Sequence, residues 1–141
     1  MPRLALITVC DRVIIDEVGV ASLIGLFNRI MPVIPPGVEV PSNAIAPKEW
    51  ALFAIWEYEP GDENREFTMT YAVRFPDGSM FNESQVNFRL DQNRNQQIRV
   101  PFVGFPIGQL GLYQVHIRLL AGDVIIQEPR PLTIELQIQQ G

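Results

Sequence analysis

A chain of 141 residues has the length of one domain, and we expect residues 1–141 to form a single domain around one core. Hydrophobic residues make up 47% and charged residues 19%, which excludes a disordered chain, and twelve prolines are too many for a helix bundle. The net charge of −5 argues against nucleic-acid binding, and the single cysteine excludes a disulfide-stapled domain. No apolar run reaches the length of a membrane span or a signal-peptide core, so we expect a cytoplasmic protein without a membrane partner.

The first third of the chain predicts two strands and a long irregular segment. Residues 4–11 are apolar and β-branched, which predicts a buried strand. Residues 20–31 fit either a strand or a helical stripe, and their glycine favours the strand. Residues 32–49 contain five prolines and are predicted to form a long loop, in which Pro35 and Pro36 hold an extended path. Such a loop either contacts a partner or covers a sheet edge.

The middle of the chain predicts four strands. Residues 50–58 carry apolar side chains on both faces, which indicates a central strand. Residues 67–75 and 86–90 alternate between apolar and polar, as half-buried antiparallel strands do. Residues 98–102 form a short strand, and Pro101 within it indicates an edge position.

Two loops are expected around that edge strand. Residues 91–97 are polar, whereas residues 102–108 are apolar and punctuated by glycine and proline. A contiguous exposed apolar surface marks an interaction site, although packing over the end of the fold is an equal alternative for this loop. The candidate partner-binding residues of the two apolar loops are Pro35, Pro36, Phe102, Phe105 and Ile107.

The last third predicts a pair of strands at residues 111–121 and 132–138, with inward Tyr113 near the start of the first. A tyrosine at this place closes a corner in immunoglobulin-like domains through its hydroxyl group. Short strands separated by turns therefore predict an all-β, two-sheet antiparallel sandwich of immunoglobulin-like type with about eight or nine strands. A β-barrel is the alternative.

The residues that carry chemistry favour a protein without catalysis. His116 is the only histidine and lies mid-strand on the predicted solvent face, whereas reactive groups usually lie at strand ends or in loops. Cys10 lies in the first apolar strand, where a cysteine is most often a small buried hydrophobe. One histidine and one cysteine do not predict a zinc site. We therefore expect no catalytic, cofactor-binding or metal-binding residue and no enzyme.

Two groups of charged residues have a possible binding role and a simpler interpretation. Five acids within ten residues are interpreted as a solvated turn, because their spacing matches no calcium loop: Glu57, Glu59, Asp62, Glu63 and Glu66. Four arginines on outward strand positions would form a stripe for acidic partners if their strands shared a sheet: Arg74, Arg89, Arg99 and Arg118. Solvated arginines paired with nearby acids are the favoured interpretation.

Residues 6–30 and the segment 111–117 together resemble a family of short bacterial β-sandwich proteins of unknown function. The resemblance covers most of the chain and rests on hydrophobic and glycine spacing. It implies the sandwich fold and the compartment, and it brings no catalytic residue.

The sequence thus predicts a non-catalytic protein-interaction or accessory module of a bacterial multi-protein system. The expected partner is another protein or a second copy of this chain, without a cofactor. A structural subunit of a homo-oligomer or phage-like assembly is one alternative. A small-ligand or carbohydrate-binding module that uses Trp50, Trp56 and the acidic turn is another.

Overall fold

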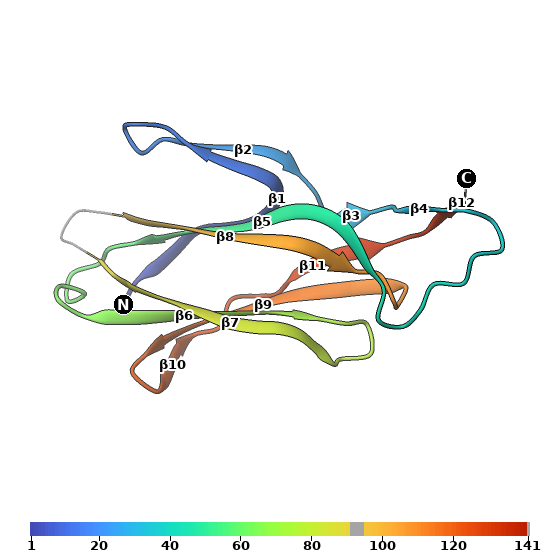
Figure 1. Ribbon diagram of the computed structural model, residues 1–141. Coiled ribbons are helices and arrows are strands. Elements are labelled where there is room, and N and C mark those ends of the chain that lie inside the picture. Colours follow the sequence, from blue (N-terminus) through green and yellow to red (C-terminus); the bar gives the residue numbers. More distant parts are fainter. Residues whose placement is uncertain (91–94, 141) are drawn as a thin grey trace.

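The computed structural model describes residues 1–90 and 95–140, and every regular element in them is a strand. Two sheets face each other as layers and do not close into a barrel (Figure 1). The predicted two-sheet sandwich is therefore confirmed, and the barrel alternative is wrong. Within the described ranges, no helix is long and apolar enough to cross a bilayer.

The two sheets draw their strands from distant parts of the chain. The first sheet has the order β2-β1-β5-β8 with antiparallel neighbours throughout, and its strands are β1 (Arg3–Ile15), β2 (Ala21–Leu26), β5 (Ile45–Glu57) and β8 (Asn95–Pro106). The second has the order β3-β11-β9-β6-β7, with β10 also on β9, and its strands are β3 (Arg29–Ile30), β6 (Glu66–Arg74), β7 (Met80–Arg89), β9 (Gly111–Ala121), β10 (Val124–Gln127) and β11 (Leu132–Leu136). A third, small parallel pair joins β4 (Val33–Ile34) to β12 (Gln139–Gln140).

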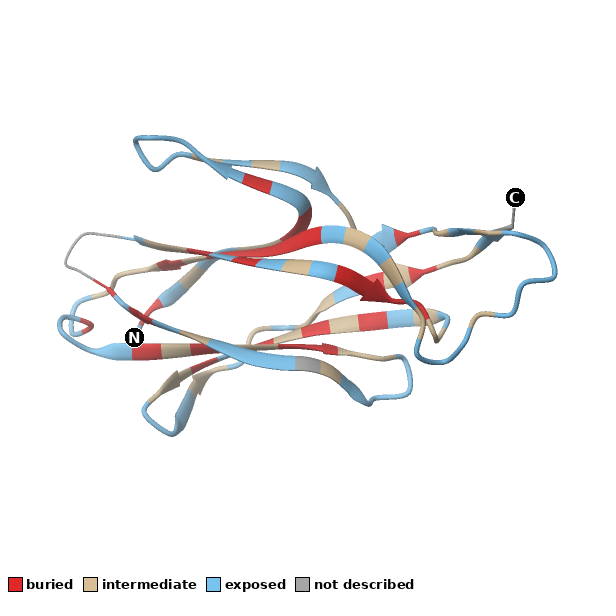
Figure 2. Ribbon diagram, in the orientation of Figure 1, coloured by how far each residue is buried: buried red, intermediate tan, exposed pale blue. Residues whose placement is uncertain are grey.

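The main core lies between the two large sheets, where alternate residues of each strand point inward (Figure 2). Tyr113 is completely buried in it, and its ring lies 5.0 Å from that of Phe105 between centroids. The Tyr113 hydroxyl donates a hydrogen bond to the backbone oxygen of Gln109, at 2.7 Å. The predicted tyrosine corner is thereby confirmed.

A second, smaller core lies on the outer face of the first sheet. β1 pairs with β5 only as far as Cys10, and beyond that point it continues with β2 as a hairpin. Val13 and Leu23 of this hairpin pack with Phe53 of β5. Figure 1 shows the hairpin lying over β5 and β8. β5 is therefore covered on both faces, which confirms the central strand predicted at residues 50–58.

Other predicted strands are confirmed with shifted bounds. Residues 20–31 form β2 and β3, so the strand interpretation is right and the helical one is wrong. The strand predicted at 67–75 is β6, and the one at 86–90 is the second half of the longer β7. Pro101 lies in β8, which has β5 as its strand partner and stands at the edge of the first sheet, as predicted.

Two predicted loops are shorter than predicted, because strands extend into residues 32–49 and 102–108. β5 begins at Ile45, inside the loop predicted at 32–49, and its pairing with β8 shifts between Ala46 and Glu49, so that Pro47 lies in the irregularity. A proline is tolerated there because a bulge frees the strand from regular hydrogen bonding.

β8 likewise runs to Pro106 through the loop predicted at 102–108. Gly104 adopts a φ of +96° within it, a conformation that favours glycine. Of the polar loop predicted at 91–97, residues 91–94 lie outside the described residues, and Asn95 already belongs to β8.

The first strand is less buried than predicted. Among residues 4–11, Val9 and Cys10 are buried, and the others are half-buried or exposed. In its first half, Leu4 and Ile7 are only partly buried against the main core, and Ala5 and Leu6 are exposed.

Candidate functional site

The two prolines predicted to contact a partner lie on the surface. Pro35 and Pro36 are both exposed and follow β4, where the backbone oxygen of Pro35 accepts a hydrogen bond from the N–H of Val38, at 3.3 Å. This turn lies at the end of the sandwich that also carries the C-terminal strand (Figure 1). Both side chains are therefore accessible.

The three candidates at residues 102–108 are placed inward. Phe105 is fully buried and Ile107 is 7% exposed. Phe102 is half-buried and stacks on Trp50, with ring centroids 4.2 Å apart. These side chains stabilise the core, so a contact surface on β8 would have to use its exposed residues, such as Val103 at 86% exposure.

The two tryptophans are interior residues. Trp50 is 2% exposed and donates its indole N–H to the backbone oxygen of Gly104, at 2.9 Å. Trp56 is fully buried, and its indole nitrogen lies 3.4 Å from the sulfur of Met69. Neither ring presents a face on which a sugar could stack.

The single cysteine and the single histidine lie on different sheets. Cys10 is completely buried in the smaller core, as predicted, and this burial raises the pKa of its thiol. Its sulfur lies 3.5 Å from the backbone oxygen of Arg12. His116 lies on the second sheet, paired with Ala72 of β6. The fold does not bring the thiol and the imidazole together as a nucleophile and its base.

One residue of the acidic turn departs from its interpretation as a solvated acid. Asp62 is completely buried rather than solvated. One of its carboxylate oxygens accepts the N–H of Glu59 at 2.9 Å, and the other lies 2.7 Å from the amino group of Met1. Nearby, the Tyr58 hydroxyl donates to the carboxylate of Glu63, a bond that raises the pKa of Tyr58 to about 12. Two carboxylates, those of Asp62 and Glu63, therefore hold this turn in place.

The four outward arginines divide between the sheets. Arg99 belongs to β8 of the first sheet, whereas the other three belong to β6, β7 and β9 of the second. Arg89 pairs with Glu66 and Arg118 with Glu128, each at 3.3 Å, which confirms the interpretation as paired, solvated arginines for these two. A single stripe of four arginines is wrong.

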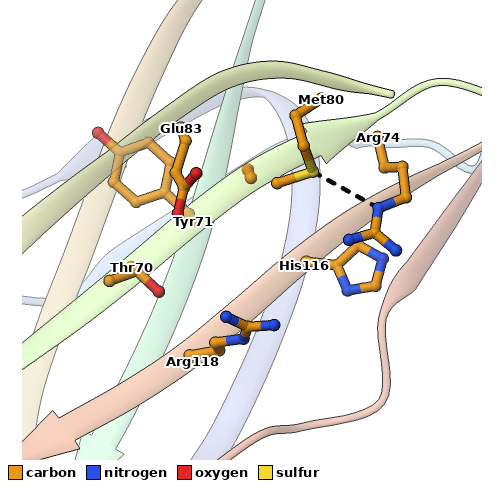
Figure 3. A pocket seen from close by; sticks show the side chains of 8 residues that line it. Thr70, Tyr71, Arg74, Met80, Glu83, His116 and Arg118 are labelled. Atoms are coloured by element: carbon orange, nitrogen blue, oxygen red, sulfur yellow. Dashed lines mark hydrogen bonds between the residues drawn. The ribbon is translucent and has the colours of Figure 1, made fainter. Parts of the chain in front are cut away.

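Arg74 and Arg118 nevertheless converge with His116 on a shallow depression of about 150 Å³ in the outer face of the second sheet (Figure 3). The Nε2 atom of His116 lies 3.0 Å from the side-chain oxygen of Gln114. Burial first, and then Arg74 and Arg118, lower the pKa of His116. Sequence spacing placed all three on outward positions, but only the pairing of β6 with β9 brings them together.

The sequence analysis did not anticipate an apolar edge strand at β2. The hairpin of β1 and β2 carries Ile24 at 44%, Leu26 at 64% and Val20 at 57% exposure. β2 has β1 as its partner and stands at the edge of the first sheet, with no charged residue and no proline among its six residues. The sequence favoured a strand here, but it did not indicate the edge position.

Across the described residues, no group of three or more His, Cys, Asp or Glu side chains could hold a metal ion. No protein-family model matches the chain, and no curated protein matches it.

Proposed function

We propose that this protein is a non-catalytic binding module that adds a strand of another protein to the edge of β2. The observation that carries this proposal is the unprotected edge: β2 combines unpaired backbone groups with exposed Ile24 and Leu26. In such strand addition, main-chain hydrogen bonds supply affinity and alternate side chains supply specificity.

The two long edge strands β8 and β7 are better protected than β2. β8 carries Pro101 and Arg99, and β7 carries Glu83 and Arg89. Prolines and charged side chains are the usual devices that prevent a sheet edge from pairing with another chain. The absence of such devices from β2 supports its use as a contact.

The hairpin is also rigidly supported for this role. Val13 and Leu23 anchor it on Phe53, and the side chain of Gln97 donates to the backbone oxygen of Gly19 in its turn, at 3.1 Å. Full burial of one large apolar side chain contributes about 1.5–3 kcal/mol. Ile24 and Leu26 are 44% and 64% exposed, so each could contribute about half of that on binding.

The wider assignment extends the sequence analysis. The tyrosine corner of Tyr113 supports an immunoglobulin-like class of sandwich. We propose a cytoplasmic, bacterial protein that acts as an accessory component of a multi-protein system and does not bind nucleic acid, in line with its net charge of −5.

The test compares partner capture by three proteins: the wild type, the double variant I24K/L26K, and the control V124K. Val124 is 64% exposed on β10 of the other sheet, so the control adds a lysine at a similarly exposed strand position. The proposal expects capture to be lost only in I24K/L26K, with folding unchanged by circular dichroism. Equal capture by all three proteins would refute it.

A second copy of this chain is the alternative occupant of the same edge. Two β2 strands can pair antiparallel about a two-fold axis, because such an interface uses the same surface on both copies. Light scattering over a range of concentrations separates the two cases. Self-association that I24K/L26K abolishes would identify a homo-oligomer, whereas a monomer at all concentrations would exclude it.

A further inference from the structure

The outer face of the second sheet brings three nitrogen-bearing side chains around one small residue. Ala72 of β6 pairs with His116 of β9, Thr70 pairs with Arg118, and Arg74 lies two positions beyond Ala72. Residues two positions apart share a face of a strand. Ala72 is 4% exposed, so its methyl group forms a floor that the longer side chains surround.

The charges of this cluster are incompletely balanced. Arg74 has its Nε atom 3.5 Å from the sulfur of Met80, and it forms no ion pair with any described residue. Arg118 has a single contact with Glu128, and both residues are about half exposed. Such an exposed pair contributes only about 0–1 kcal/mol and is readily exchanged for another anion.

We propose that Arg74, His116 and Arg118 form a binding site for one oxyanionic group, a phosphate or a carboxylate. Figure 3 shows the guanidinium of Arg74 beside the ring of His116, with Arg118 on the same face. Guanidinium groups bind planar or tetrahedral oxyanions through paired N–H donors. The depression of about 150 Å³ suits one such group, since sites for drug-sized ligands occupy about 300–1,000 Å³.

Charged side chains from several neighbouring elements surround His116. β6 supplies Arg74, and β9 itself supplies Arg118, and both lower the pKa of the imidazole. Glu128, which follows β10, raises it, and Glu83 of β7 lies at the margin of the depression. β11 places the neutral Thr133 beside Gln114. A bound anion would offset the two guanidinium groups and so stabilise the imidazolium form.

The single histidine makes a direct assay possible. We expect saturating inorganic phosphate to raise the pKa of His116, measured by NMR of the imidazole, by about one pH unit relative to sodium chloride at equal ionic strength. By linkage, this rise equals about tenfold tighter binding of phosphate to the protonated form. A short glutamate-rich peptide forms the second arm, because it presents the same chemistry as a protein-borne carboxylate.

Two variants separate this site from general electrostatics. R74Q/R118Q is expected to abolish the anion-dependent rise and to raise the pKa of His116 in chloride, whereas R99Q on the other sheet leaves both measurements unchanged. R74Q alone gives a partial loss and serves if the double variant is unstable. A rise with phosphate or with the peptide supports the site and identifies its source. No rise with either anion, or an equal rise in R74Q/R118Q, would overturn it.

Discussion

Removal of the Tyr113 hydroxyl by Y113F is expected to lower the free energy of unfolding by about 1–2 kcal/mol. The hydroxyl donates to the backbone oxygen of Gln109 at 2.7 Å, and the phenylalanine would leave that oxygen without this partner. A buried unsatisfied group costs about 1–3 kcal/mol. Gln109 is half-buried, so water can replace part of the bond, and the lower part of that range applies.

Thermal unfolding followed by circular dichroism measures the effect. At about 2.1 cal/mol/K of unfolding entropy per residue, the loss corresponds to a fall in Tm of about 3–7 °C for this chain. Y58F is the matched control, because the hydroxyl of Tyr58 bonds the exposed Glu63, where water can replace it, so its loss should lower Tm by less than Y113F does. A Tm for Y113F equal to that of Y58F would refute the structural role of the corner.

Three further predictions address other parts of the fold. G25A should destabilise the protein more than G19A, by about 1 kcal/mol or more. Both glycines have positive φ, but a Cβ at Gly25 would also clash with the side chain of Asp11, whereas a Cβ at Gly19 would meet no atom. Equal losses of stability in urea unfolding would count against this contact. The thiol of Cys10 should react with a disulfide reagent only on unfolding, because it is buried and its pKa is raised, and rapid labelling of the native protein would contradict that burial. Spectrophotometric titration should show Tyr58 ionising near pH 12 and, in E63Q, closer to pH 10. The pKa of Tyr58 in the folded protein is above that in the unfolded chain, so this bond stabilises the fold below about pH 10. Its contribution is lost as the pH rises through 12.

Local patterns predicted those elements whose environment is uniform along the strand. Residues 67–75 alternate strictly and form β6, since one face packs on the core throughout. Residues 50–58 are apolar on both faces, and the hairpin supplies the cover that this composition requires. Tyr113 was recognisable because its corner depends on residues close in sequence.

Predictions failed where a distant segment determined the outcome. Glycine and proline suggested a loop at residues 102–108, but pairing with β5 keeps this segment extended, with Gly104 at a positive φ. Asp62 looked like a solvated acid, and its burial depends on the amino group of Met1, far away in sequence. The depression at His116 requires the register of β6 against β9, which no local pattern specifies.

The parallel pairing of β3 with β11 bears on how the chain acquires its structure during synthesis. Arg29 and Ile30 have their partners at Glu135 and Leu136, so β3 cannot take its place in the sheet until those two residues have left the ribosome. The β1–β5 and β5–β8 pairs also join distant segments. Folds dominated by such non-local pairs fold in milliseconds to seconds. The β1–β2 hairpin joins segments that are close in sequence, so it can form well before the second sheet is complete.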